Sequence, residues 1–176
     1  KRWQDFGITE VITVSDAITD FLNKYMPGLT IHQYSPSIPQ NLFTPPHQEK
    51  VLGICFMASR GLEQQVKVKT ILRIFQLRYP QYKNIPVVEL KDMTRAQFAR
   101  TLAEYSVALF TDEVAGWGTL PLEAMACHTH VVGFRTYGGQ EYMTADNGFW
   151  VTNGDVCALG EKLGEVIDKL YKKELD

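Results

Sequence analysis

The sequence predicts an α/β fold: a doubly wound parallel sheet, Rossmann-like, with helices on both faces. Three observations support this prediction. From residue 50 onward, short apolar runs alternate with segments of helical period, which is typical of βαβ units. The apolar runs are continuous, as expected of strands that are buried on both faces. The chain has 176 residues, 45% of them hydrophobic, which is enough to build the core of one ordinary domain.

The expected elements follow one another in a regular order. Apolar strands are predicted at residues 50–57, 85–90, 106–110, 130–134 and 148–151. Helices with one apolar face are predicted between and after them, over 61–79, from Thr94, after the loop 111–121, and from Asp155 to the end. Thr94 and Asp155 carry side-chain oxygens that suit the position just before a helix.

The first 49 residues differ from the rest of the chain. A strand is expected at 11–14, a helix capped by Ser15 follows, and a second strand is expected at 30–34. Four of the eight prolines then fall within 35–49, where fixed φ angles and missing N–H donors favour a linker or extended loop. We therefore divide the chain into the tail of another domain with its linker, 1–49, and a Rossmann-like domain, 50–176.

Composition argues against several classes of protein. The net charge is −2 without a basic block, so a nucleic-acid surface is not indicated. No apolar run approaches the ~20 residues of a membrane span. The three cysteines are widely spaced in apolar segments, which indicates reduced thiols and a cytoplasmic protein. No Cys/His spacing matches a zinc site, and we expect no metal.

Several catalytic motifs are missing from the sequence. The loop after the strand at 50–57 reads ASRGLEQ and does not match the dinucleotide fingerprint, which needs its glycines there. It also has no acidic cluster of the kind a phosphorylated receiver domain uses. There is no Walker A loop and no G-x-S-x-G elbow. The four histidines form no catalytic triad, and we interpret His128 and His130 as structural.

Ligands of open parallel sheets bind beyond the carboxyl ends of the strands. The loop with the most informative residues there is TDEVAGWGTLP, 111–121. Gly116 and Gly118 permit positive φ and close backbone approach, and Pro121 suits the first position of a helix. The N–H groups that open this helix then form an anion site. Glu123 follows in the first turn, where its carboxylate can accept the hydroxyls of a ribose.

The residues alone leave alternatives open at each of these positions. Glu123 either binds ribose or only complements the helix dipole. Arg60 faces a diphosphate or is a solvated loop residue, and Trp117 stacks on a base or packs as a lid on its loop. Gly138 and Gly139 offer N–H groups to a ligand or form a plain turn. Lys67 and Lys69 are interpreted as surface charges.

The sequence GWGTLPLEAMACHTHVVGF, followed by YGGQEY and NGFWVTNGD, resembles the donor-binding half of the GT-B glycosyltransferases known as group 1. Members carry Gly-Phe-Gly, a Pro-x-x-Glu-Ala-Met-Ala helix, a Val-Val strand, a Gly-Gly-x-Glu turn and an Asn-Gly pair. The resemblance covers roughly residues 50–170. The segments VSDAITDFL and PQNLFTP also resemble the family's crossing between its two domains.

The resemblance implies that residues 50–176 bind the donor, a nucleoside diphosphate sugar, as a substrate and without a metal or another cofactor. Glu123 would bind the ribose and Arg60 the diphosphate, and both are our catalytic candidates. The donor would also contact the segment Gly116, Trp117, Gly118, Thr119 and Leu120, with Gly138 and Gly139 near the nucleotide. The reaction implied is hexosyl transfer to an acceptor hydroxyl, with retention, by an enzyme of which this chain is a fragment. The chain would be inactive without the N-terminal acceptor domain.

Two departures from the family pattern bear on this prediction. Most retaining members have a second Glu eight positions before the ribose Glu, and that position is Ala115 here, with Glu113 two residues out of register. The usual Cys-Gly-Thr-Pro turn is Cys-His-Thr-His, with His128 in place of Gly. The first departure leaves a non-catalytic nucleotide-binding module as the alternative function. A generic α/β interaction domain, whose glycine loop is only a turn, is a third and more remote alternative.

Overall fold

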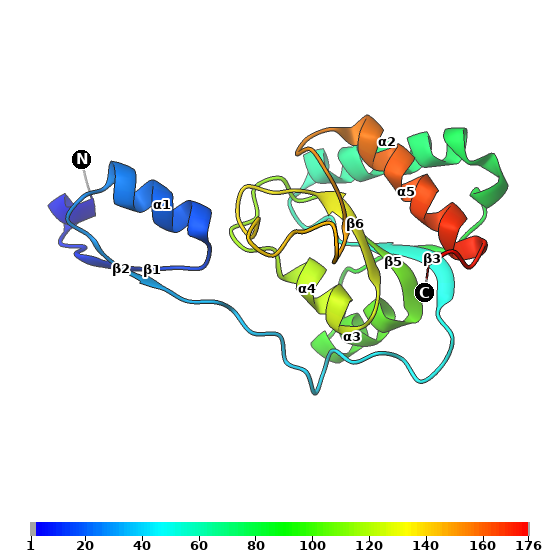
Figure 1. Ribbon diagram of the computed structural model, residues 1–176, viewed down its shortest axis with the longest axis horizontal. Coiled ribbons are helices and arrows are strands. Elements are labelled where there is room, and N and C mark those ends of the chain that lie inside the picture. The colour runs from blue at the N-terminus through cyan, green and yellow to red at the C-terminus, as the bar shows by residue number, and fades with distance from the viewer. Residues whose placement is uncertain (1–2, 176) are drawn as a thin grey trace.

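The computed structural model describes residues 3–175, which form two separate sheets joined by an extended segment (Figure 1). The larger unit contains β3 (Val51–Phe56), α2 (Leu62–Arg78), η2 (Pro80–Tyr82), β4 (Val87–Glu89), α3 (Arg95–Glu104), β5 (Tyr105–Phe110), α4 (Thr119–Ala126), β6 (His130–Phe134), β7 (Phe149–Val151) and α5 (Val156–Tyr171). The smaller unit contains η1 (Trp3–Phe6), β1 (Glu10–Thr13), α1 (Asp16–Tyr25) and β2 (Thr30–Gln33).

The larger sheet has five parallel strands in the order β4-β3-β5-β6-β7. Chain order therefore reverses between β3 and β5, because β4 lies on one side of β3 and β5 on the other. This reversal is the topological switch point of a doubly wound sheet, where ligands bind beyond the carboxyl ends of the strands. The predicted fold class is confirmed.

Alternate residues of the strands supply two different cores, as the two-residue period of a strand requires. On one face Ile54, Val107 and Val132 pack against α2 and α5. On the other face Cys55, Ala108 and Val131 pack against α3 and α4. Figure 1 shows the same arrangement, with α2 and α5 on one side of the sheet and α3 and α4 on the other.

The smaller unit is a parallel β1–β2 pair bridged by α1. Ser15 caps α1 by accepting a hydrogen bond from the Ile18 N–H. Only Leu22 of the expected apolar stripe is buried, whereas Phe21 is 48% and Tyr25 61% exposed. A two-stranded unit does not provide enough surface to cover these side chains.

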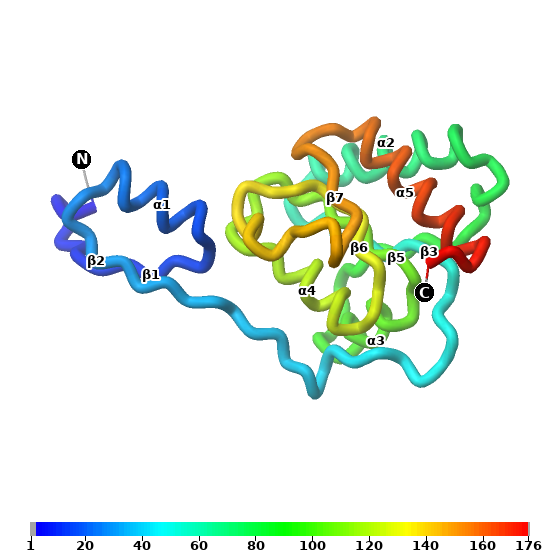
Figure 2. Tube along the Cα trace, viewed as in Figure 1, coloured from blue at the N-terminus to red at the C-terminus, as the bar shows by residue number. Residues whose placement is uncertain are grey.

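The proline-rich segment contains no helix or strand, as expected, but it does not lie free of the larger unit (Figure 2). The Pro39 carbonyl accepts hydrogen bonds from the N–H groups of Leu42 and Phe43 and closes a turn. The turn presents Phe43 to the α3–α4 side of the sheet, where it is 2% exposed. The Thr44 backbone also hydrogen-bonds the Cys127 thiol at the end of α4.

Most predicted element boundaries are confirmed to within two residues, but the predicted start of α4 is wrong. We expected Pro121 at the first helical position, whereas α4 begins at Thr119 with Gly118 as its cap. Gly118 has a φ of 79°, and this left-handed residue turns the chain into the helix. Gly116, for which positive φ was also considered, does not adopt it.

Candidate functional site

The loops that follow β3 and β5 meet at the switch point. Arg60, after β3, donates from Nε to Asp112 Oδ2 of the loop after β5, at 2.6 Å. The side chain of Arg60 is 52% exposed, whereas that of Asp112 is 15% exposed. The structure therefore places Arg60 at the predicted edge with about half of its side-chain surface open, and gives it a carboxylate partner that the sequence did not identify.

A buried glutamine fixes the relative position of these two loops. Gln64, in the first turn of α2, is 8% exposed. Its Oε1 accepts a hydrogen bond from the Arg60 N–H at 2.9 Å, and its Nε2 donates to Thr111 Oγ1 at 3.3 Å. Both ends of one amide are satisfied, so this side chain links the loops after β3 and β5, beyond the last backbone pairing of the two strands at Phe56 and Leu109.

The glycine loop 115–118 opens α4 as a site for an anion. Within the part of the chain that the structure describes, no acceptor takes a hydrogen bond from the N–H of Thr119 or Leu120. These two amides open the helix, where the positive end of its dipole lies. The Leu120 side chain is only 3% exposed and belongs to the core. This exposed fraction is that of the whole residue, so contact between Leu120 and a donor stays a prediction.

Tyr142 and Gly138 hold the glycine loop in place. The Tyr142 hydroxyl donates to the carbonyl of Gly118 at 2.6 Å or to that of Trp117 at 3.0 Å. Burial, together with the nearby Glu141 carboxylate, raises the pKa of Tyr142 well above its usual value, so the hydroxyl remains a donor. The Gly138 N–H donates to the Ala115 carbonyl at 3.2 Å. This N–H is therefore already used within the protein.

Gly138 and Gly139 are explained by the close approach of two loops. A side chain at Gly138 would place its Cβ 2.0 Å from the Gly116 carbonyl oxygen. At Gly139, which has a φ of 75°, the Cβ would lie 2.1 Å from the Trp117 carbonyl oxygen. The structure thus brings both glycines against the loop that opens α4, and their contact with a nucleotide stays a prediction.

Trp117 packs beside Tyr142, with the ring centroids 5.5 Å apart. Its indole Nε1 is buried and, among residues 3–175, has no hydrogen-bond partner. A buried donor without a partner costs about 1–3 kcal/mol. The ring contributes to the packing of its loop, and base stacking by Trp117 stays a prediction.

Glu123 is the buried acid of α4, but it is not in the first helical turn as we expected. It is the fifth residue of the helix and is only 2% exposed. Its Oε1 accepts a short hydrogen bond from Nη2 of Arg95, the first residue of α3. Glu123 is therefore one half of an ion pair between helices, which excludes the view that it only complements its own helix dipole from the surface.

Lys67 is not the solvated surface charge that we expected. Its side chain is 18% exposed and its ammonium forms an ion pair with the carboxylate of Glu113, in the loop after β5. Asn153 Nδ2 also donates to the backbone carbonyl of Glu113 at 3.0 Å. The acid nearest in sequence to the family's missing Glu is thus held against α2, a contact that no local sequence pattern indicates.

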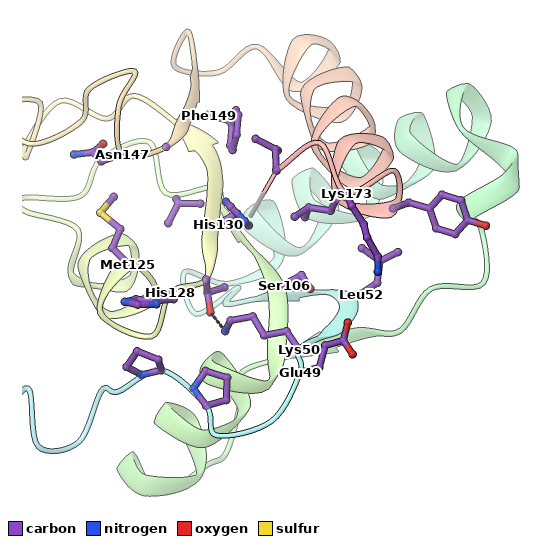
Figure 3. Close-up of a pocket in the computed structure, with 18 of the residues that line it drawn as sticks. Glu49, Lys50, Leu52, Ser106, Met125, His128, His130, Asn147, Phe149 and Lys173 are labelled. Atoms are coloured by element: carbon purple, nitrogen blue, oxygen red, sulfur yellow. Dashed lines mark hydrogen bonds between the residues drawn. The ribbon is translucent and has the colours of Figure 1, made fainter.

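A cavity of about 1170 Å³ lies at the opposite, amino-terminal edge of the larger sheet (Figure 3). It is lined by the linker, the first residues of β3, β5 and β6, and the end of α5, including Lys50, His128 and His130. Lys50 Nζ donates to Thr129 Oγ1 at 2.8 Å and to the Ala103 and Tyr105 carbonyls. Burial lowers the pKa of Lys50. Because three acceptors take up its ammonium, we assign Lys50 a structural role and do not place the functional site in this cavity.

Neither a metal-ion cluster nor a membrane-spanning helix is present among residues 3–175. These residues bring no three His, Cys, Asp or Glu side chains together in a group that would suit a metal ion. They also include no helix that is both long and apolar enough to cross a membrane.

The family model described as glycosyl transferases group 1 matches residues 86–174, which include β5, the glycine loop and α4. The chain belongs to this family. It is also similar, at 25% identity over 179 aligned positions, to an α-1,6-glucosyltransferase of Actinobacillus pleuropneumoniae serotype 7, strain AP76. The alignment covers 99% of this chain and 47% of that relative, so the chain spans about half the length of the curated relative it matches.

Solved structures of group 1 glycosyltransferases and related enzymes share the fold. A Staphylococcus aureus TarM variant in complex with UDP has a TM-score of 0.69 at 16% identity, covering 91% of this chain and 37% of TarM. The pneumococcal O-GlcNAc transferase GtfA, in complex with UDP and GlcNAc, has a TM-score of 0.66 at 14% identity, covering 94% and 39%. The C-terminal domain of Francisella tularensis LpcC, a group 1 family protein, has a TM-score of 0.64 at 13% identity, covering 77% and 90%.

Proposed function

We propose that residues 50–176 form the donor-binding half of a glycosyltransferase that transfers a hexosyl group from a nucleoside diphosphate sugar to an acceptor hydroxyl, with retention and without a metal. The observation that carries the proposal is the construction of α4. The buried Glu123 and two helix-opening amides, which have no acceptor among residues 3–175, belong to the same eight-residue helix. One element thus offers donors to a diphosphate and a carboxylate to a ribose.

In this reaction the bond between the anomeric carbon and the diphosphate oxygen breaks, and a bond forms from the same carbon to the acceptor oxygen. The diphosphate leaves with the electron pair, so negative charge grows on it, and the acceptor hydroxyl gives up its proton to the leaving diphosphate or to water. The amides of Thr119 and Leu120 and the guanidinium of Arg60 stabilise that charge electrostatically. Because Asp112 already pairs with Arg60, part of this cation's charge is offset.

The smaller unit supports the proposal that the chain is a fragment. Exposed apolar side chains gather on it, including Ile12 at 74% and Phe6 at 65%. We assign β1, α1 and β2 to the tail of the N-terminal acceptor domain, which would cover these side chains. Transfer takes place in the cleft between the two domains, so the donor-binding domain alone is inactive. The unpaired thiols Cys55, Cys127 and Cys157 fit a cytoplasmic enzyme.

Calorimetric titration tests the proposal. UDP is the first ligand to try because it is bound in the similar structures of TarM and GtfA, and GDP and TDP follow. Glu123→Gln should weaken binding by about 1.5–3 kcal/mol, the contribution of hydrogen bonds to a charged group. Glu161→Gln, which removes an exposed carboxylate that also pairs with an arginine, should leave affinity unchanged. If none of the three nucleotides binds the folded chain, the proposal is wrong.

A second candidate is a nucleotide-binding module without transferase activity. Ala115 stands where most retaining members have the Glu that contacts the transferred sugar, and Glu113 is held by Lys67. A module of this kind binds UDP and a UDP-sugar equally, because the sugar adds no contact. Tighter binding of the sugar nucleotide, or product formation by the parent protein, would exclude it.

A further inference from the structure

The ion pair of Glu123 extends to the interdomain linker. The guanidinium carbon of Arg95 lies 4.7 Å from the ring centroid of Phe43 and 5.4 Å from that of Phe98. These two rings meet edge to face, with their centroids 6.3 Å apart. Phe43 comes from the linker and Phe98 from α3, so the cation is held between two elements that are far apart in the sequence.

A carboxylate buried as deeply as Glu123 requires a partner, because an uncompensated buried charge is strongly destabilising. Arg95 is the cation that bonds to it. The Arg95 side chain is 54% exposed, so burial alone does not fix its position. Contacts with neighbouring side chains have to hold it. Cation–π contacts with two rings supply that constraint.

Arg95 has a second effect on an anionic ligand. A nucleoside diphosphate is negatively charged, and a bare carboxylate in its site would repel it. Arg95 neutralises this carboxylate while bonding only to Oε1. Since a carboxylate has about four lone-pair positions, Glu123 retains the capacity to accept ribose hydroxyls.

We propose that Phe43 and Arg95 are positioning residues of the donor site: the linker ring holds the guanidinium, and the guanidinium orients and neutralises Glu123 for the ribose. This inference rests on the proposed function and deepens it, because it makes the interdomain linker part of nucleotide recognition. The linker path past α3 and α4 is visible in Figure 2.

The experiment compares UDP with 2′-deoxy-UDP by calorimetry on the full chain. The wild type should bind UDP about tenfold or more tightly, the effect of one hydrogen bond to a charged group. Arg95→Lys keeps the charge but loses the planar guanidinium, and Phe43→Leu keeps an apolar side chain but loses the ring. In both variants the preference for UDP should fall about threefold or more, toward that of Glu123→Gln. Tyr34→Leu, which removes an exposed aromatic ring from residues 1–49, is the matched control and should keep the wild-type preference.

The preference for ribose separates positioning from a merely structural role, which would weaken binding of both nucleotides equally. An unchanged preference in Arg95→Lys and Phe43→Leu would overturn this inference and leave the proposed function standing. An increase in UDP affinity in Arg95→Lys would also overturn it, because Arg95 would then compete with the ribose. Failure of the wild type to bind any nucleotide contradicts the proposed function, and the inference fails with it.

Discussion

At the scale of single residues, the site owes its shape to positions where only glycine fits. Gly138 and Gly139 let the loop after β6 touch the backbone of the loop before α4, and Gly118 lies against the side chains of Tyr142 and Phe110. Two of the three combine a positive φ with a close neighbour, Gly118 at 79° and Gly139 at 75°. Glycine at these positions is required by packing, whether or not a ligand is present.

Replacing Gly139 with Ala should therefore destabilise the protein by about 2–4 kcal/mol. The new Cβ meets a backbone oxygen at 2.1 Å, which cannot rotate away, and overpacking adds to the cost of positive φ. Urea unfolding followed by circular dichroism measures the change. Gly61→Ala is the matched control, since Gly61 has a φ of 80° but open space around it. Its ψ of −164° lies in a region open almost only to glycine, so this variant should lose about 1–3 kcal/mol from backbone strain alone. A loss at Gly139 no larger than this one would contradict the packing argument.

Whether a site residue could be predicted from the sequence depends on how far along the chain its contact partner lies. Glu123 stood out because it is the one charge in an apolar helix, and Arg60 because it follows a strand at the predicted edge. Their partners were not predictable. Arg95 lies 28 positions from Glu123 and Asp112 lies 52 positions from Arg60, and no local pattern reports a contact over such distances.

At the scale of elements, the crossing of α2 and α5 is the tightest helix contact. Gly164 of α5 lies against the ring of Tyr79, which caps α2, and a Cβ at this glycine would approach the ring to 2.0 Å. Gly160, one turn earlier, packs on Ile74. Two small residues on one face of α5 thus set how closely the helices approach each other.

Intrinsic helix propensity predicts that Gly164→Ala stabilises α5 by about 1 kcal/mol. The contact predicts the opposite, and we expect it to dominate, with a net loss of about 1–3 kcal/mol. Thermal and urea denaturation give the sign. In a Tyr79→Leu background the same substitution should cost much less, because the two residues are in contact and their effects do not add. A net gain in the wild-type background would show that the ring moves aside freely.

Element boundaries were well predicted where a side chain marks them, and poorly where a backbone angle does. Ser15, Thr94 and Asp155 each cap a helix as expected, by accepting a backbone hydrogen bond. The start of α4 was misplaced because Pro121 is a strong signal for a first position. Gly118, which actually caps the helix, makes no side-chain cap hydrogen bond and acts through its positive φ. A backbone angle of this kind cannot be read from the sequence.

At the scale of the whole molecule, the reactivity of the three cysteines depends on how deeply the folded chain buries them. Cys55 and Cys127 are each 0% exposed, and Cys157 is exposed. Burial raises the pKa of Cys55 to about 12 and also raises the pKa of Cys127. The thiolate is the reactive form. Both buried thiols are therefore unreactive toward alkylating reagents, because they stay protonated and because the reagent cannot reach them.

Brief treatment of the native chain with iodoacetamide at pH 8 should therefore modify Cys157 alone, as read by mass spectrometry of tryptic peptides. Denaturation in urea should expose all three thiols to the reagent. The prediction also has a pH direction: the folded state keeps the Cys55 proton between pH 9.0 and about 12, whereas the unfolded state loses it. This thiol thus makes the folded state less stable as the pH rises through that range. Labelling of Cys55 in the native state would contradict its burial between the sheet and α3.

The anchoring of Phe43 has a mechanical consequence. Ile38 also packs against the larger unit, whereas β2 ends at Gln33. Because the Tyr34 N–H donates to the Thr13 carbonyl, the tether between the two anchored positions is only residues 35–37, one of them a proline. At 3.3–3.6 Å per residue, the four steps from Tyr34 to Ile38 span at most about 14 Å. This short tether limits how far the two units can move apart, and the Asp16 N–H also donates across them to Glu141 Oε1 at 3.2 Å.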